Sequence, residues 1–311
     1  MTQMTLNVFQ NFHCIAGDCK HSCCIGWEID IDEDALDDYR QVGGDFGRRL
    51  SMNIEWTDTP HFKLTKDERC PFLNQQNLCD IILNLGEESL CQICTDHPRF
   101  RNFFSDHTEI GLGLCCEAAA KQVLSFKEKA EEVVLVEEDG SEPLSEWEQT
   151  ILSARQRLMD IAQDRSLPFS ARLQKISDYA GAKAAQKSLS GWAAFYKTLE
   201  RLSADWDKEL EILPQIETPL QNPPEALPDT PFEQLSVYFL YRHLPDAENE
   251  QDLKKRAGFA ALSCQILFAL CVEKTKNGKP FSVDMLAELA RMYSSEIEYS
   301  QENTDSLLDV L

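Results

Sequence analysis

Ten of the twelve cysteines lie within the first 116 residues of this 311-residue chain, in four closely spaced groups. The groups are Cys14, Cys19, Cys23 and Cys24; Cys70 and Cys79; Cys91 and Cys94; and Cys115 and Cys116. Thiolates are soft ligands that hold zinc or iron–sulfur clusters in proteins. The crowding therefore predicts a metal centre, provided that the thiols stay reduced.

The start of the chain argues for a reducing compartment. Residues 1–12 contain no basic segment, no apolar run and no small-residue cleavage site of the kind that a secretory signal has. No later stretch approaches the roughly 18 apolar residues of a membrane span. We therefore expect a cytoplasmic protein; in an oxidising compartment the same cysteines would instead predict a disulfide framework.

Charge limits the classes of partner. The chain has 53 acidic and 30 basic residues, a net charge of -23. Such a surface repels phosphate backbones and anionic lipids, so neither nucleic acid nor a membrane is expected as a partner. Cationic ligands or lysine-bearing proteins are favoured.

The pattern of apolar residues predicts a mainly α fold in two domains. A cysteine-rich domain over residues 1–136 would contain short helices and loops: one after the N-cap Asp32, one at 78–85 ended by Gly86, and a longer one at 117–136. An acidic turn at 137–143 would separate it from an all-helical domain at 144–311, on which it would pack.

Apolar residues at helical spacing place helices in the second domain at 144–161, 192–210, 232–244, 253–272 and 283–300. Six prolines between 214 and 231 predict an extended crossing loop. Cys264 and Cys271 fall on the apolar stripe of one helix and are expected in the core. No glycine-rich turn of the Rossmann type is present in the sequence.

Spacing does not decide which metal is bound. Cys14-x4-Cys19-x3-Cys23-Cys24 is short enough for one loop to surround a metal, although adjacent cysteines point apart. All-sulfur ligation suits tetrahedral zinc or a cubane cluster, and His13, His21 or His97 could replace a thiol. The radical-type Cys-x3-Cys-x2-Cys triplet does not occur, because residue 26 is glycine.

Two of the groups have further interpretations. Cys91-x2-Cys94 could be a redox pair, but no βαβ pattern surrounds it. Cys115 and Cys116 open a predicted helix, whose dipole would stabilise a thiolate. Buried reduced cysteines are the ordinary alternative for any one thiol, and ten in about a hundred residues exceed what that accounts for.

The order of these motifs resembles the FliB family of flagellin lysine-N-methylases, whose N-terminal part is similar to CxxCxxCC-type zinc- or iron-chelating domains. The resemblance spans nearly the whole chain: it includes one segment near each end and the cysteines between them, and it is most specific in the cysteine-rich half. The matching residues are Phe12-His13-Cys14, Asp18-Cys19, Ser22-Cys23-Cys24-Ile25-Gly26-Trp27, Cys70-Pro71-Phe72-Leu73, Leu78-Cys79, Leu85-Gly86-Glu87, Cys94, Pro98-Arg99, Cys115 and Ser295-Glu296-Ile297-Glu298-Tyr299-Ser300.

The resemblance implies an enzyme that transfers a methyl group from S-adenosylmethionine to lysines of flagellin, or of another protein, with a cysteine-bound iron–sulfur cluster or zinc. The implied metal ligands are Cys14, Cys19, Cys23, Cys24, Cys70, Cys79, Cys94 and Cys115. Cys91 and Cys116 are additional to the family pattern. The centre would hold the fold, bind the cofactor or transfer an electron.

Methyl transfer to lysine requires a neutral amine. Keeping lysine neutral at pH 7 costs roughly 4 to 5 kcal/mol, given a pKa of about 10.4. Buried carboxylates and tyrosines are candidates to line a lysine channel, with packing as their ordinary alternative: Glu233, Tyr238, Tyr241, Glu296 and Glu298. The absence of a recognisable adenosine-binding motif motivates a second hypothesis, a non-enzymatic structural or redox-sensing metal protein.

Overall fold

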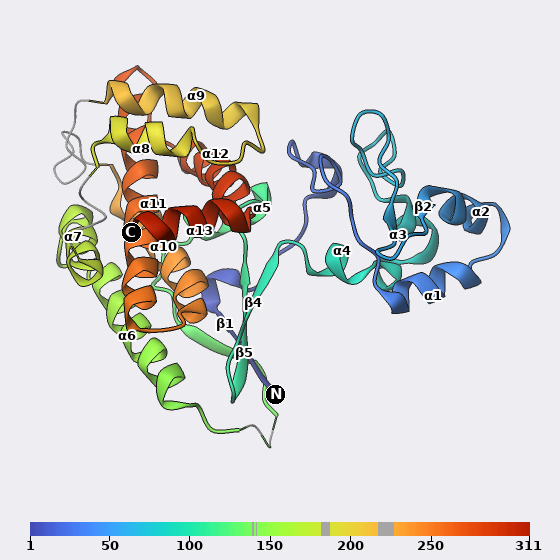
Figure 1. The fold of residues 1–311 in the computed structure, drawn as a ribbon, viewed down its shortest axis with the longest axis horizontal. Coiled ribbons are helices and arrows are strands. Elements are labelled where there is room, and N and C mark those ends of the chain that lie inside the picture. Colours follow the sequence, from blue (N-terminus) through green and yellow to red (C-terminus); the bar gives the residue numbers. More distant parts are fainter. Residues whose placement is uncertain (139, 141, 182–186, 217–226) are drawn as a thin grey trace. The chain divides into compact units, whose positions relative to one another are not determined.

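A computed structural model describes the whole chain except residues 139, 141, 182–186 and 217–226, and its contacts divide the chain into two units (Figure 1). Unit 1 comprises Met1–Phe12 and Phe100–Leu311, and unit 2 comprises His13–Arg99. The cysteine-rich unit 2 is thus an insertion within unit 1. This division differs from the expected boundary between residues 136 and 144, because strand pairing joins the first residues to the later chain.

A four-stranded sheet in unit 1 makes that connection. Its order is β4-β5-β1-β6. The strands are β1 (Thr2–Leu6), β4 (Arg99–Phe103), β5 (His107–Leu112) and β6 (Glu132–Val136). β1 pairs in parallel with β5 and antiparallel with β6. A mainly helical fold is confirmed, with a small sheet that the sequence pattern did not predict.

The helix predicted at 117–136 is wrong in its second half. Helix α5 (Glu117–Ser125) ends early, and β6 occupies the last five residues of the predicted span. Three valines fall within that strand, and β-branched side chains favour extended backbone. A short apolar run is compatible with a strand or a helix, so the sequence pattern alone does not distinguish the two structures.

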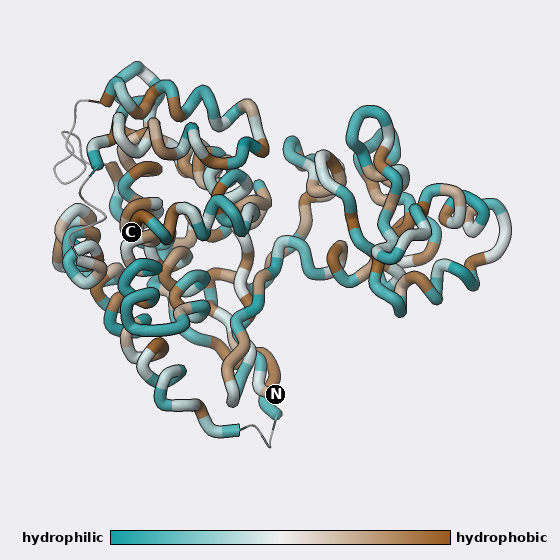
Figure 2. The backbone as a smooth tube through the Cα atoms, viewed as in Figure 1, coloured by the Kyte–Doolittle hydropathy of each residue, from teal (hydrophilic) through white to brown (hydrophobic). Residues whose placement is uncertain are grey.

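Helices make up the rest of unit 1. They are α6 (Glu146–Ala162), α7 (Phe169–Ala180), α8 (Leu189–Tyr196), α9 (Ala204–Ile212), α10 (Asp229–His243), α11 (Glu250–Lys276), α12 (Val283–Tyr293) and α13 (Gln301–Val310). Outer helices such as α9 alternate hydrophilic and hydrophobic residues (Figure 2). By contrast, every residue of α10 from Pro231 to Tyr241 is buried, which confirms the predicted central helix.

Two predicted helices in unit 1 are interrupted. The stripe at 192–210 is divided between α8 and α9, because Ser203 caps a new helix by accepting a hydrogen bond from the Asp205 amide. The helix predicted at 283–300 ends at Tyr293 and continues as a π-helical turn, Ser294–Glu298. Within the predicted proline-rich loop, residues 217–226 lie outside the described chain, and α10 already begins at Asp229 with Pro231 in its first turn.

The long helix α11 belongs to the core. The expectation that no stretch approaches a membrane span is wrong by length and composition, because this helix is long and apolar enough for one. However, 89% of its most apolar window is buried inside the protein. Cys264 and Cys271 are both fully buried on it, as predicted. The helix has the properties of a buried core helix, while a cytoplasmic location stays a prediction.

Unit 2 has its own small core. Its elements are α1 (Glu33–Gln41), α2 (Gly44–Asn53), α3 (Asp80–Leu85), α4 (Gln92–Asp96), β2 (Ile54–Glu55) and β3 (His61–Phe62). Asp32 caps α1 and Gly86 ends α3 in a left-handed conformation with φ of 100°, both as predicted. Cys70 and Cys91 are buried among the aromatic and aliphatic side chains of this core.

Asp32 connects two helices of unit 2. One carboxylate oxygen accepts a hydrogen bond from the Ala35 amide at 3.0 Å, and the other accepts one from the Gln92 amide, at the start of α4, at 2.6 Å. Asp32→Ala should therefore destabilise unit 2 by about 2 kcal/mol. Hydrogen exchange of the α1 and α4 amides measures this effect. Asp34→Ala, in the same helical turn, is the control; equal protection in both variants would contradict the shared-cap role.

Candidate functional site

Five thiols of unit 2 belong to one core, which we call the thiol core: Cys24, Cys70, Cys79, Cys91 and Cys94. Backbone contacts bring distant segments together there. The Cys70 amide donates a hydrogen bond to the Cys24 carbonyl at 2.8 Å, and Cys79 faces Leu73 in a short antiparallel bridge. Cys91 is the N-cap of α4, and Cys94 lies within that helix.

The thiols of this core influence one another's protonation. Burial raises the pKa of Cys70 to about 12, and repulsion from Cys24 and Cys79 acts in the same direction. Side-chain hydrogen bonds join Cys24 to Cys23, its neighbour in the chain outside the core, and Cys91 to Cys94 within the core. The first bond lowers the pKa of Cys24 to about 7, and the second lowers the pKa of Cys91 and raises that of Cys94.

The thiol core has the donor chemistry of a metal centre but not its geometry. Thiolates of this number would suit zinc or an iron–sulfur cluster. Among the residues that the structure describes, however, no group of three or more histidine, cysteine or carboxylate side chains is arranged to hold a metal ion. The thiols are gathered into one core without a formed coordination shell.

The other cysteines named by the resemblance are not members of the thiol core. Cys14 is exposed, and its sulfur accepts a hydrogen bond from the Ala16 amide. Cys19 and Cys23 are half-buried in the same loop. Cys115 belongs to unit 1, whereas Cys91, which is additional to the family pattern, is completely buried in the thiol core. Sequence order alone did not reveal the position of Cys91.

The three histidines beside cysteines, for which a surface or core position is favoured over metal ligation, and the thiolate expected at the start of α5 lie outside the thiol core. His13 and His21 are exposed, while burial lowers the pKa of His97. Cys116 is the N-cap of α5, as predicted. The helix dipole does not produce a thiolate at Cys115, because burial raises the pKa of that thiol to about 12.

In unit 1 a fully buried carboxylate organises a polar cluster, the Glu298 network. Glu298 accepts hydrogen bonds from the Tyr238 hydroxyl at 2.9 and 3.0 Å, and His243 Nε2 lies 2.6 Å from one of its oxygens. Arg242 Nε lies 3.4 Å from the same oxygen, and its Nη1 donates to the Tyr238 hydroxyl at 2.7 Å. The π-helical turn that carries Glu298 is a feature frequent at functional sites.

Charge neutralisation keeps Glu298 ionised. Burial alone would favour the protonated acid, but Arg242 and His243 hold the pKa of Glu298 at about 2. The Arg242 guanidinium also lies over the rings of Phe100 and Tyr299, 5.2 and 4.9 Å from their centroids. Arg242 is not among the residues predicted from the sequence. Its position four residues after Tyr238 on a helix does indicate that the two side chains are neighbours.

The remaining candidates for a lysine channel have separate partners. Glu233 accepts from the guanidinium groups of Arg165 and Arg172. Glu296 accepts from Arg201 and from the amides of Leu202 and Ser203. The Tyr241 hydroxyl is buried without a hydrogen-bond partner. Of the five candidates, only Tyr238 and Glu298 are brought into one site, and their polar atoms are already engaged by each other and by Arg242.

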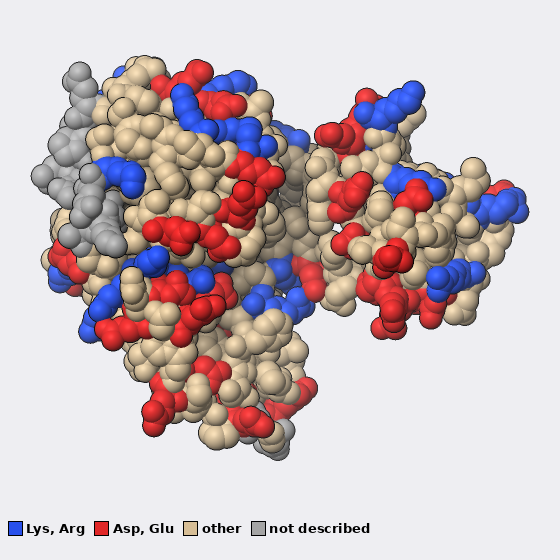
Figure 3. Space-filling model, in the orientation of Figure 1, with Lys and Arg blue, Asp and Glu red and all other residues tan. Residues whose placement is uncertain are grey.

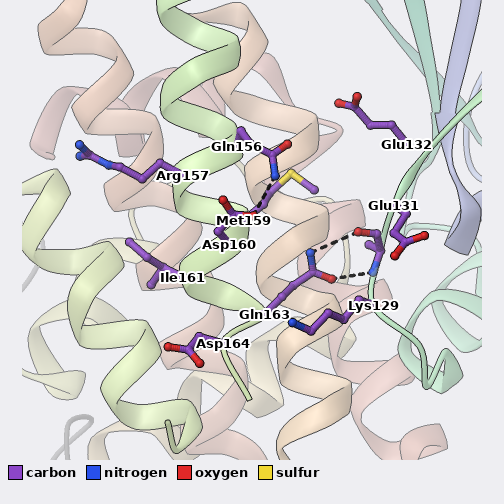
Figure 4. A pocket seen from close by; sticks show the side chains of 11 residues that line it. Lys129, Glu131, Glu132, Gln156, Arg157, Met159, Asp160, Ile161, Gln163 and Asp164 are labelled. Carbon is purple, nitrogen blue, oxygen red and sulfur yellow. Dashed lines mark hydrogen bonds between the residues drawn. The ribbon is translucent and has the colours of Figure 1, made fainter. Parts of the chain in front are cut away.

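A polar pocket of about 680 Å³ lies elsewhere in unit 1, between α6 and the segment that leads into β6 (Figure 4). Its lining carries four carboxylates and two cations: Glu131, Glu132, Asp160, Asp164, Lys129 and Arg157. The Gln163 side chain fixes one wall, because it accepts from the Ala130 amide at 2.6 Å and donates to the Ala130 carbonyl at 3.2 Å. No sequence motif marked this pocket.

Comparison with known proteins gives distant relatives. The chain is 24% identical to proteins named lysine-N-methylase from Salmonella choleraesuis and Salmonella typhimurium, over 156 and 155 residues respectively. These matches cover 46% of this chain and only 38% of either relative. The similarity to these lysine-N-methylases is thus low and partial. It is also 26% identical to the flagellar biosynthetic protein FliU of Salmonella muenchen, over 37% of this chain and 72% of that protein.

No family model and no solved structure matches the chain. The resemblance to lysine-N-methylases is therefore supported by sequence similarity over under half of the chain, and the fold described above has no matched structural precedent. Methyl transfer by this chain, its methyl donor, its metal and its substrate are proposals.

Two buried tyrosines on α10 should respond oppositely to loss of the hydroxyl group. Tyr238→Phe removes the hydroxyl that Glu298, Arg242 and the Leu114 amide contact, and should cost about 1 to 3 kcal/mol of unfolding free energy. Tyr241→Phe removes an unpartnered hydroxyl and should be neutral or stabilising. Urea unfolding compares the two variants, and an equal loss in both would contradict these assignments.

The Glu298 network should make unit 1 sensitive to acid. The folded pKa of Glu298 is about 2, below the ordinary 4.5, so its contribution is complete above about pH 4.5 and is lost as the pH falls towards 2. That contribution is about 3 kcal/mol by linkage. The stability difference between wild type and Glu298→Gln should shrink over this range in urea unfolding curves. Glu302→Gln, an exposed control, should show no such change.

Proposed function

We propose that this protein is a protein-lysine N-methyltransferase that transfers a methyl group from S-adenosylmethionine to lysine side chains, with flagellin as its substrate. The observation that carries the proposal is the similarity to the two lysine-N-methylases. The similarity to a flagellar biosynthetic protein supports the choice of flagellin. A different lysine-bearing protein is the alternative substrate.

The charge of the molecule suits such a substrate. With a net charge of -23, the surface attracts lysine-rich segments, and acidic side chains cluster on both units on the face shown in Figure 3. Attraction alone favours the charged ammonium, whereas transfer requires the neutral amine. The reacting lysine must therefore lose its proton in a desolvated position or to a base, at a cost of roughly 4 to 5 kcal/mol.

We further propose that the thiol core holds the metal centre, an iron–sulfur cluster or zinc. Cys24, Cys70, Cys79 and Cys94 combine membership of this core with the implied ligand pattern, and Cys91 is a fifth donor there. A bound centre would join the chain segments that these residues come from. The protein would bring the donors together and favour the thiolate of Cys24, whose pKa is lowered to about 7.

The second candidate function is a non-enzymatic structural or redox-sensing protein. The hydrogen-bonded pairs Cys23–Cys24 and Cys91–Cys94 favour it, because two adjacent thiols with one lowered pKa are suited to reversible oxidation. Both functions would use the same core. They differ in whether a methyl group is transferred.

Methyl transfer is tested with protein purified anaerobically and incubated with S-adenosylmethionine labelled in its methyl group and with purified flagellin. We expect label in flagellin, located on lysine by peptide mass spectrometry. Flagellin with its surface amines acetylated is the control, since it lacks the nucleophile. Absence of label with metal-loaded protein would overturn the enzymatic proposal, and label on a different added protein would change only the substrate.

Removing thiols from the thiol core should release the metal. Cys70→Ser and Cys94→Ser are expected to lose most of the bound iron or zinc and to destabilise unit 2, because metal binding energy contributes directly to folding. Elemental analysis and visible absorption measure the loss. Cys264→Ser, in the core of unit 1, should retain the full metal content. Unchanged metal in the first two variants would show that the thiol core is not the site.

A further inference from the structure

Strand β6 presents an unpaired edge to solvent. It is the last strand in the order β4-β5-β1-β6, and in the described part of the chain it pairs only with β1. Its apolar side chains are unusually exposed: Val134 by 52%, Leu135 by 45% and Val136 by 42%. Exposed apolar edge strands are templates for pairing with another extended chain, so native proteins commonly cover or charge them.

The acidic pocket is continuous with this edge. Residues 129–132 form one of its walls and lead directly into β6, and Glu132 belongs both to the pocket lining and to the strand. The lining contains four carboxylates and two cationic side chains. One of those cations, Arg157, stacks on the ring of Tyr179 at 5.1 Å, and one of the carboxylates, Glu132, lies 3.5 Å from Arg155. The remaining carboxylates, Glu131, Asp160 and Asp164, outnumber the remaining cation, Lys129.

The ladder between β1 and β6 limits where another chain can pair. Thr5 faces Val133 and Met4 faces Val134, but Gln3 faces Val136, so Leu135 is an extra residue in a bulge. A bulge interrupts regular pairing. The regular part of the edge is therefore Glu132–Val134, the part nearest to the pocket.

We propose that this edge and pocket bind an extended, lysine-bearing segment of a protein partner by strand addition. Backbone hydrogen bonds to Glu132–Val134 would supply affinity, Val134 and Val136 would contact apolar side chains of the segment, and the acidic pocket would take a lysine. Charge complementarity identifies the partner as basic. A role of this site in docking a methylation substrate rests on the proposed function. Peptide binding at the site can be tested separately.

The test is fluorescence polarisation with a labelled peptide that alternates valine and threonine around a central lysine. Val134→Lys combined with Val136→Lys should weaken binding at least about tenfold, since lysines block edge pairing and repel the peptide. Glu131→Gln combined with Asp160→Asn should weaken it less, and chiefly at low salt. A peptide with glutamate in place of lysine should bind poorly to the wild type.

Phe103→Lys is the matched control. Phe103 is 74% exposed on β4, the strand at the opposite edge of the same sheet. Unchanged binding in this variant, with loss in the β6 variant, supports the inference. Equal loss in both variants, or no loss in the β6 variant, overturns it.

Methylation assays separate this inference from the proposed function. If flagellin is methylated and the β6 variant has an unchanged KM for flagellin, the docking inference fails while the proposed function stands. If no protein is methylated but the peptide binds at β6, the proposed function fails while the binding site stands. Circular dichroism of both lysine variants should match the wild type, because the substituted side chains are exposed.

Discussion

The pairing of β1 with β5 is the constraint on which the rest of the structure depends. These strands run parallel, with Thr2 beside His107 and Thr5 beside Ile110. Parallel neighbours require a long connection, and here the connection contains all of unit 2. The cysteine-rich segment thus folds between two strands that must find each other across about a hundred residues. The same pairing places β6 at the edge of the sheet, since β1 has a neighbour on each side.

Buried carboxylates paired with arginines organise the interior of unit 1. Glu109 with Arg155, Glu233 with Arg172, and Glu298 with Arg242 are three such pairs. Removing the arginine of any pair would reduce the charge compensation of a buried carboxylate, which is destabilising. Because these arginines neutralise buried acids, they do not offset the excess of acidic residues on the surface. Buried charges are therefore paired, whereas the surface carries the net negative charge.

The sequence carried enough information for the helices with strong periodicity or clear caps. Asp32, Gly86 and the apolar run of α10 each predicted an element that the structure contains. It did not reveal the sheet, because β1 and β6 are five-residue strands whose partners are distant in the chain. Local pattern also does not predict a π-helical turn, in which Glu296 and Glu298 contact residues that are distant in the chain.

The sequence indicates which types of residue form the candidate sites, but not which of these residues lie together in the fold. The excess of cysteines indicated thiol chemistry, yet only the fold places Cys91 in the thiol core and Cys115 in unit 1. Likewise, Tyr238 and Tyr241 lie on one buried helix, and only the three-dimensional contacts distinguish the bonded hydroxyl from the unpartnered one. Side-chain pairing depends on neighbours brought from far along the chain.

The insertion of unit 2 gives the molecule two covalent crossings, one after Phe12 and one before Phe100. A protease that cleaves a single crossing therefore does not separate the two units, since the other crossing still holds them in one chain. Domains joined end to end, by contrast, are released by one cut. The cysteine-rich unit is connected to unit 1 at two points, so in a molecule cut at one of them each unit stays at a high effective concentration relative to the other.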